Sequence, residues 1–332
     1  MRFDQLKRRD FISLIGGAAA AWPLVARAQQ AERMRRVGFL AAGSEKDAQW
    51  QAQFAAFKEG LQLLGWTAGR NAQIEVRWAG SNLDRVQAYA RELVTWHPAA
   101  IVAGATFSLT ALQRATATIP IVFAQVSDPV RGGFVASLAH PGGNITGFAL
   151  YEYAIAAKWL ELMKQLAPHL TRLGVLYDPA NKSNAGQLSE IRAAARAEQI
   201  HAFAVRDANE IERAIENFAR ESNGGLVVLP SAVTVLHRAP LIASAATYRL
   251  PAVYAYRHFV ADGGLASYGV DLLDSYRRAA SYVDRILKGE KPGELPVQHA
   301  DKFELLINLK TAKSLGLDPP MSLLARTDEV IE

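Results

Sequence analysis

The order of strands and helices that the sequence predicts occurs twice, and this repeat constrains the fold more than any other feature. Short apolar runs alternate with segments whose apolar residues recur at steps of three and four, the spacing of an amphipathic helix. Residues 36–38 (RVG) open the first copy, and residues 172–174 (RLG) open the second, 136 positions later. Residues 119–124 (IPIVFA) have a counterpart at 250–255 (LPAVYA), 131 positions later. Similar offsets for elements in one order indicate two copies of one structural unit.

An alternation of strands and helices predicts right-handed βαβ units, in which a mostly parallel sheet carries helices on both faces. Two copies predict two such lobes. Ligands of open parallel sheets bind outside the carboxyl ends of the strands, so two lobes set against each other form a cleft between those ends. The expected fold class is therefore α/β, with two Rossmann-like lobes built on parallel sheets and a ligand cleft between them.

The first 28 residues have the composition of an export signal rather than of a folded domain. Residues 7–9 (KRR) precede a weakly apolar run over residues 11–22, and residues 26–28 (ARA) fit an A-x-A cleavage site. Paired arginines followed by a phenylalanine indicate the twin-arginine route, and hence the periplasm. An uncleaved membrane anchor is the alternative, although the run is short for a hydrocarbon layer about 30 Å thick.

Charge and composition argue against several other classes of protein. The N-terminal segment carries +3 of the net charge of +5, so the remainder is near +2 and has no dense basic patch for nucleic acid. The chain has no cysteine, and therefore no thiol nucleophile and no disulfide. It has no P-loop, no G-x-G-x-x-G after the first strand, no G-x-S-x-G elbow and no histidines at zinc-site spacing. We expect no cofactor, no metal and no catalytic residue, and a protein that closes on a small molecule.

Five stretches spread over the chain carry a family pattern when taken together. They are residues 57–79 (FKEGLQLLGWTAGRNAQIEVRWA), 119–148 (IPIVFAQVSDPVRGGFVASLAHPGGNITGF), 250–271 (LPAVYAYRHFVADGGLASYGVD), 282–317 (YVDRILKGEKPGELPVQHADKFELLINLKTAKSLGL) and 323–331 (LLARTDEVI). The chain resembles the ABC-transporter substrate-binding family of the tryptophan/tyrosine-transporter type over residues 35–331. This resemblance implies the type I periplasmic binding protein fold, with three crossings between the lobes.

The resemblance implies a periplasmic receptor of an ABC importer. Such a receptor captures a small organic, amino-acid-like solute, aromatic in some members, and delivers it to a permease in the inner membrane. The expected lobes are residues 35–147 plus 268–297 and residues 148–267 plus 298–332, and we expect a monomer. Two alternatives stay open: a periplasmic sensor that reports its ligand to a receptor kinase, and a hydrolase or lyase with its site in the cleft.

Candidate ligand-binding residues in the first lobe follow the predicted ends of strands. Residues 106–108 open a helix, where hydroxyl and backbone N–H groups can bind a carboxylate, although Ser108 could instead only cap that helix. Asp128 can accept a ligand ammonium, or it can serve only as a turn residue. The candidates in this lobe are Ser44, Thr106, Phe107, Ser108, Gln125 and Asp128.

Candidates in the second lobe occupy the corresponding positions of the repeat. Three tyrosines could form an apolar wall with polar tips, or they could only pack in the core. Ser231 is the counterpart of Thr106 or Ser108, and Asn181 is either a ligand contact or a turn residue. The candidates in this lobe are Tyr177, Asn181, Ser231, Tyr254 and Tyr268.

Overall fold

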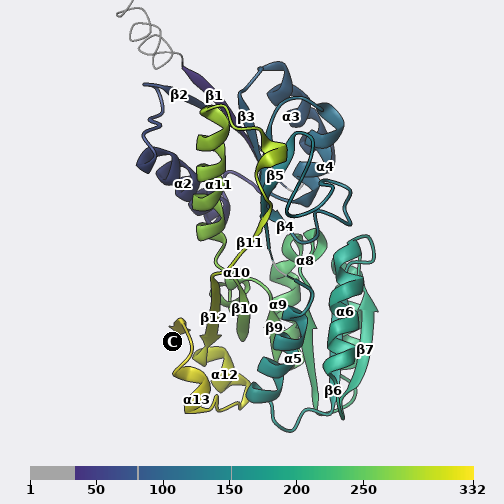
Figure 1. The fold of residues 1–332 in the computed structure, drawn as a ribbon. Coiled ribbons are helices and arrows are strands. Elements are labelled where there is room, and N and C mark those ends of the chain that lie inside the picture. Colours follow the sequence, from purple (N-terminus) through teal and green to yellow (C-terminus); the bar gives the residue numbers. More distant parts are fainter. Residues whose placement is uncertain (1–33, 81, 151) are drawn as a thin grey trace, which may run out of the picture.

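The computed structural model describes residues 34–80, 82–150 and 152–332 and consists of two α/β lobes (Figure 1). The first lobe lies at the top of Figure 1 and the second at the bottom, and the chain crosses between them in the middle. The predicted export signal lies outside the described residues. Within the described ranges, no helix is both long and apolar enough to span a membrane.

The first lobe is built on a six-stranded sheet with the order β11-β5-β4-β3-β1-β2, and its strand pairings are parallel. Side chains of β1 alternate between the faces: Val37 and Phe39 pack towards α2 and α11, whereas Leu40 packs towards α3 and α4. The strands are β1 (Arg35–Ala41), β2 (Ala72–Trp78), β3 (Ala100–Ala103), β4 (Ile121–Val126), β5 (Ile145–Ala149) and β11 (Gln298–His299). The helices are α2 (Ala48–Leu63), α3 (Leu83–Thr95), α4 (Thr106–Ala115), α11 (Leu272–Leu287) and the 3₁₀ turn η1 (Pro292–Glu294).

The second lobe is built on a seven-stranded sheet with the order β13-β12-β10-β9-β8-β6-β7. The pairing of β10 with β12 is antiparallel, and the other pairings are parallel. The strands are β6 (Arg172–Tyr177), β7 (Gln199–Ala204), β8 (Gly224–Val228), β9 (Ala252–Tyr254), β10 (Ala266–Val270), β12 (Phe303–Asn308) and β13 (Glu329–Ile331). One face packs on α5 (Ile155–Leu166), α6 (Lys182–Ala194), α12 (Leu309–Leu315) and α13 (Met321–Leu324). The other face carries α7 (Ala208–Phe218), α8 (Ala232–Leu236), α9 (Arg238–Thr247) and α10 (Arg257–Ala261).

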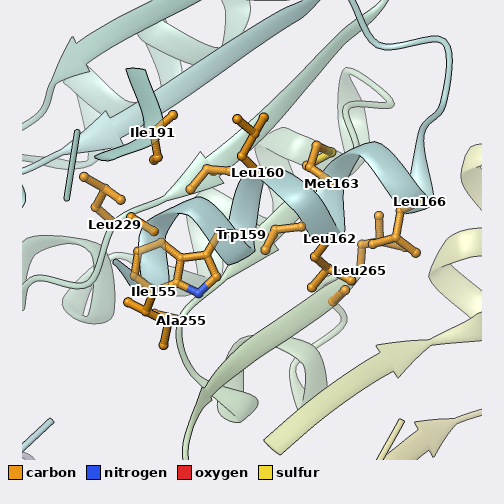
Figure 2. Close-up of a cluster of buried hydrophobic side chains, with 14 of the residues drawn as sticks. Ile155, Trp159, Leu160, Leu162, Met163, Leu166, Ile191, Leu229, Ala255 and Leu265 are labelled. Atoms are coloured by element: carbon orange, nitrogen blue, oxygen red, sulfur yellow. The ribbon is translucent and has the colours of Figure 1, made fainter. Parts of the chain in front are cut away.

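The core beside α5 holds the second lobe together (Figure 2). Ile155, Trp159 and Leu166 lie on the buried side of α5, at the spacing of an amphipathic helix. Trp159 is fully buried, and its indole N–H donates to the carbonyl of Tyr268 at 2.7 Å. The ring therefore fixes α5 against β10 both by apolar burial and by one hydrogen bond.

The chain passes from one sheet to the other three times, after Ala149, after Val270 and after His299. The boundaries expected from the sequence, after residues 147, 267 and 297, fall two or three residues before these crossings. The difference arises because strand pairing continues to the last residue of each boundary strand, β5 with β11 and β10 with β12.

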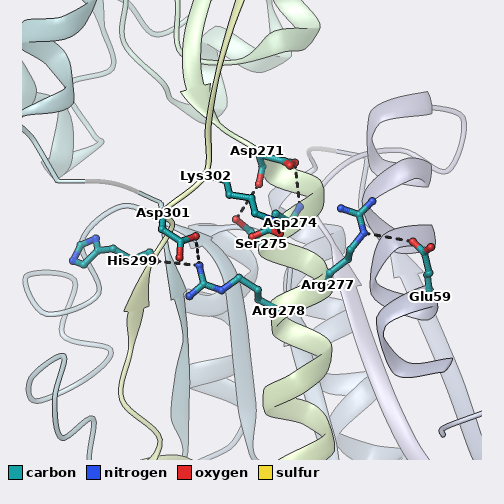
Figure 3. Close-up of polar contacts among 9 residues, drawn as sticks. All are labelled: Glu59, Asp271, Asp274, Ser275, Arg277, Arg278, His299, Asp301 and Lys302. Atoms are coloured by element: carbon teal, nitrogen blue, oxygen red, sulfur yellow. Dashed lines mark hydrogen bonds and ion pairs between the residues drawn. The ribbon is translucent and has the colours of Figure 1, made fainter. Parts of the chain in front are cut away.

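Polar contacts join the second and third crossings where they run side by side (Figure 3). The carboxylate of Asp271 caps α11 by accepting the N–H of Asp274 at 3.1 Å, while the N–H of Asp271 donates to the carbonyl of Lys302 at 3.0 Å. The ammonium of Lys302 lies 2.5 Å from the carboxylate of Asp274, and Arg278 lies 2.7 Å from Asp301. These contacts tie together two of the three crossings between the lobes.

Candidate functional site

A cavity of about 490 Å³ lies between the two lobes, and residues of both lobes line it. This volume falls within the roughly 300–1,000 Å³ that is typical of small-molecule sites. Its lining segments lie at the carboxyl ends of β1, β3 and β4 in the first lobe and of β6, β8 and β9 in the second. The parallel topology therefore positions the site, as the repeat in the sequence predicts.

Six of the eleven predicted ligand-binding residues line this cavity. They lie at the start of α4, on and after β4, and at the residues that precede α6 and α8. They lie together because the backbone topology alone brings the ends of these strands to one place. The six are Thr106, Phe107, Gln125, Asp128, Asn181 and Ser231.

Two predicted residues of the first lobe lie outside the cavity lining. Ser44 is exposed, and its hydroxyl accepts the N–H of Lys46 at 3.3 Å. Ser108 is fully buried, because Thr106, Phe107 and Thr110 occupy the side of α4 that faces the cavity. The predicted hydroxyl cluster at residues 106–108 is thus divided between the cavity and the core.

The three predicted tyrosines of the second lobe also lie outside this lining. Tyr254 is buried and stacks on Phe259 with 4.7 Å between the ring centroids, and burial raises its pKa. Tyr177 packs against the core beside α5. Tyr268 stacks on Phe303 and lines a separate pocket of about 190 Å³. Their positions match the alternative in which such tyrosines pack rather than form a cavity wall.

The first turn of α4 presents backbone N–H groups at the cavity. The residue that precedes the helix is Ala105, and no side chain caps this end. Thr106 and Phe107, the first two residues of the helix, line the cavity. Uncapped N–H groups and the positive end of the helix dipole favour an anion, so this position suits a carboxylate.

Two helix starts of the second lobe at the cavity, those of α6 and α8, are capped by side chains. Asn181 Oδ1 accepts the N–H of Ser183 at 3.1 Å, and its amide donates to the carbonyl of Pro230 at 3.0 Å. Ser231 and Thr234 form a reciprocal capping box at the start of α8. Both predicted residues therefore shape the wall of the cavity while their polar atoms are largely engaged within the lobe.

Asp128 joins the two lobes at the cavity. One carboxylate oxygen accepts the N–H of Arg131 at 3.0 Å, and the other accepts the hydroxyl of Tyr153, which lies in the second lobe just before α5. The guanidinium of Arg131 lies 5.5 Å from the centroid of the same tyrosine ring. Burial, followed by the bond to Asp128, raises the pKa of Tyr153, which stays protonated and donates.

Trp50 contributes an aromatic wall that sequence reasoning missed. Its spacing to Phe54 and Phe57 on α2 is that of a core stripe, which conceals its position at the cavity. The indole lies against two glycines. A Cβ atom on Gly43 would be 2.0 Å from the ring, and one on Gly104 would be 2.8 Å from it. Glycine at both positions makes room for the ring.

Four polar side chains that line the cavity have buried atoms without a hydrogen-bond partner among the described residues; Gln125 was predicted from the sequence, and the other three were missed. These atoms are Gln49 Nε2, Gln53 Oε1, Gln125 Nε2 and both ring nitrogens of His258. Burial, and next the charge of Arg238, lowers the pKa of His258 to about 4, so the ring is neutral at pH 7. Leaving a buried polar atom unpaired costs about 1–3 kcal/mol. These atoms belong to residues that line the cavity, so a polar ligand atom that paired them would recover part of this free energy.

The charges around the cavity are mixed, since Arg131 and Lys182 line it together with Asp128 and Asp178. Besides the hydrogen bond between Tyr153 and Asp128, an ion pair spans the lobes: Arg238 Nη1 lies 3.5 Å from Asp47 Oδ2. Mixed charge suits a zwitterion better than a multiply charged anion. In the described part of the chain, no group of three or more histidine, aspartate and glutamate side chains could hold a metal ion.

A profile of the family described as ABC transporter substrate binding protein matches residues 45–331. The chain belongs to this family. The resemblance seen in the sequence is confirmed, and with it the general role of the family, whose members bind small-molecule substrates and work with ABC permeases.

Related proteins include amino-acid binders. A tyrosine-binding protein from Clostridioides difficile is 27% identical over 264 residues, which cover 79% of this chain and 75% of that protein. A domain from Streptococcus pneumonia, solved in complex with L-Trp, is 25% identical with a TM-score of 0.82, over 90% of this chain and all of that one. A conserved domain protein from Vibrio cholerae is 28% identical with a TM-score of 0.81 and the same coverage. These likenesses confirm the predicted type I periplasmic binding protein fold.

Proposed function

We propose that this family member binds an amino acid with an aromatic side chain between its lobes and delivers it to the permease of an ABC importer. The observation that carries the proposal is the cavity itself, which combines an uncapped helix start, mixed charge and an aromatic wall. The relatives named for tyrosine binding and solved with L-Trp support the same class of ligand. Capture and release of an unchanged solute, rather than catalysis, is part of the proposal.

The ligand carboxylate binds at the start of α4 in this proposal. The N–H groups of Thr106 and Phe107 belong to the first turn of a ten-residue helix, and both residues line the cavity. Charge-assisted bonds to backbone N–H groups are among the stronger hydrogen bonds in proteins. A helix start without its own cap keeps these donors for the ligand.

The ligand ammonium binds near Asp178 in the second lobe. Asp178 is buried, lines the cavity, and uses Oδ1 to accept the N–H of Ala180 at 2.8 Å. Among the described residues, its Oδ2 has no partner, whereas both oxygens of Asp128 are engaged by Arg131 and Tyr153. A ligand held by its carboxylate on one lobe and its ammonium on the other favours the closed arrangement.

Lobe closure and export complete the proposal. The pairs Asp128–Tyr153 and Asp47–Arg238 both span the lobes, so opening the cleft breaks them.

The twin-arginine signal expected in residues 1–28 would bring the folded protein, as a monomer, to the periplasm. Fractionation of cells that express the full chain, and light scattering of the purified protein, test these two points.

Thermal unfolding with a panel of the twenty L-amino acids and small organic acids tests the proposal directly. A ligand at 100 times its Kd stabilises the folded state by about 2.7 kcal/mol, so its Tm should rise by several degrees. L-Tryptophan or L-tyrosine should give the largest rise. If no compound of the panel shifts the Tm, the protein is not an amino-acid receptor.

The variant Asp178→Asn tests the binding mode. The amide can still accept the N–H of Ala180, but it removes the charge that faces the ligand ammonium. We expect affinity for the amino acid to fall about tenfold, with no loss for the analogue that lacks the α-amino group. Asp207→Asn is the matched control, because Asp207 also accepts a backbone N–H, that of Glu210 at 2.8 Å, but does not line the cavity. An equal loss for both ligands would contradict the assignment of the ammonium.

A further inference from the structure

One part of the cavity carries polar groups that the proposed carboxylate and ammonium contacts leave unused. Gln53 lies in the second turn of α2 and is almost fully buried, and His258 lies in α10 of the opposite lobe. Arg238, whose charge acts on His258, pairs with Asp47 at the start of α2. The first turns of α2 and the region around α10 therefore meet across the cavity.

The imidazole of His258 is held rigidly. It stacks on Tyr256 with 5.4 Å between ring centroids and on Phe259 with 5.0 Å, at interplanar angles of 19° and 29°. Both of its nitrogens are buried and have no hydrogen-bond partner in the described part of the protein. Because the ring is neutral at pH 7, it offers one donor and one acceptor.

Gln53, on the facing lobe, also has a buried side-chain atom without a partner. Its Oε1 makes no hydrogen bond with any described residue. Trp50, one turn earlier on the same helix, packs against Gly43 and Gly104 and lines the same cavity. A ligand that pairs these atoms recovers the free energy that their burial without a partner costs, whereas a hydrocarbon ring does not.

We propose that His258 and Gln53 hydrogen-bond to the side chain of the ligand, so that the cavity selects an aromatic ring bearing a hydroxyl or N–H group over a hydrocarbon ring. This inference rests on the proposed function, since it concerns the side chain of the same amino acid. A phenolic hydroxyl can donate to Gln53 Oε1 and accept from the imidazole N–H, and an indole N–H can donate to either acceptor. Phenylalanine offers neither, although its ring fits the same aromatic wall.

The expected discrimination is large, because a site built to hydrogen-bond a polar group rejects the analogue that lacks it more strongly than it rejects a mere change of size. We expect the better bound of L-tyrosine and L-tryptophan to bind at least about tenfold more tightly than L-phenylalanine. Titration calorimetry at pH 7 with the purified protein and these three amino acids measures the ratio.

Two variants locate the source of this preference. His258→Phe and Gln53→Leu keep the volume of the side chain and remove its polar atoms, so each should bring the ratio towards one mainly by weakening the polar ligand. His201→Phe is the matched control, because His201 also packs on a phenylalanine and has a buried, unpaired Nε2, but it does not line the cavity. Should His258→Phe not fold, Gln53→Leu still decides the question.

The outcomes separate this inference from the proposed function. If none of the three amino acids binds, the proposed function fails and the inference falls with it. If all three bind equally to the wild-type protein, or if both variants keep the wild-type ratio, the inference is wrong while the amino-acid receptor stands. A ratio that collapses in His258→Phe or Gln53→Leu, and is kept in His201→Phe, supports it.

Discussion

The ion pair between Asp47 and Arg238 spans the two lobes, and we predict that Asp47→Asn weakens ligand binding without unfolding the protein. Asp47 Oδ1 accepts the N–H of Gln49 at 2.9 Å and so caps α2, while Oδ2 lies 3.5 Å from Arg238. Asparagine is an equally good helix cap, so the substitution removes the charge and keeps the cap. Any effect on affinity then reports the contact between the lobes.

The magnitude follows from the geometry of the pair. Two unit charges 3.5 Å apart interact by about 4–5 kcal/mol at an effective dielectric constant of about 20. The two side chains are 21% and 27% exposed, and Arg238 also binds Asp262 at 2.6 Å, so screening and lost side-chain entropy reduce the net contribution to about 1 kcal/mol. If only the closed state contains the pair, the Kd of Asp47→Asn should rise about fivefold.

Titration calorimetry at low salt and at about 0.5 M salt provides the assay, because screening weakens a partly exposed pair. The difference between variant and wild type should shrink at high salt. Glu290→Gln is the control, since it removes a partner of Arg285 at 2.6 Å within the first lobe and should leave the Kd unchanged. An unchanged Kd of Asp47→Asn at low salt, or the same loss at both salt concentrations, would refute a role for this pair in closure.

Three further predictions concern other parts of the structure. Gly43→Ala should weaken ligand binding about tenfold in titration calorimetry, because the new Cβ displaces Trp50; retained affinity would show that the indole does not form the binding wall. Because the pKa of His258 falls from 6.5 to about 4 on folding, the unfolded chain binds more protons and the stability in urea should fall as the pH drops from 6.5 towards 4. His258→Phe should lose less stability over this interval, and equal losses would contradict the assignment. Trp159→Ala should lower the free energy of unfolding in urea by about 3–5 kcal/mol, and a loss below 1 kcal/mol would mean that the core beside α5 collapses around the gap.

The sequence predicts the two-lobed architecture well because parallel strands covered on both faces are short apolar runs with a regular order. Residues of β3, such as Ile101 and Val102, pack on opposite faces of the same sheet and leave an unbroken apolar pattern. The positions of the crossings carry no such signal. Tyr268 pairs with β12 in the second lobe, although the expected boundary assigned it to the first, because the antiparallel partner of β10 lies more than thirty residues further along the chain.

The site was predictable only where the backbone determines it. Thr106 and Phe107 begin a helix directly after a strand, so the topology places them at the cleft regardless of side-chain packing. The predicted Tyr254 is buried and does not line the cavity, whereas Tyr256, two residues later, does line it. The strand ends between these positions, and the chain turns into α10 there. Such a change of direction cannot be read from composition or periodicity.

The residues that sequence reasoning missed share a physical trait that becomes visible only in three dimensions. In the sequence, Gln53 and His258 lie in helices of two different copies of the repeat. Only the structure shows that both line the same cavity. In a core, an unpaired buried amide or imidazole destabilises the fold by about 1–3 kcal/mol, so buried polar groups are nearly always paired. Five of the eleven unpaired buried side-chain atoms of the described residues belong to residues that line this cavity, where a bound ligand can supply the missing partners. A comparison of amino acids with polar and hydrocarbon rings measures that pairing directly, since the ring shape stays nearly constant and only the hydrogen-bonding atom changes.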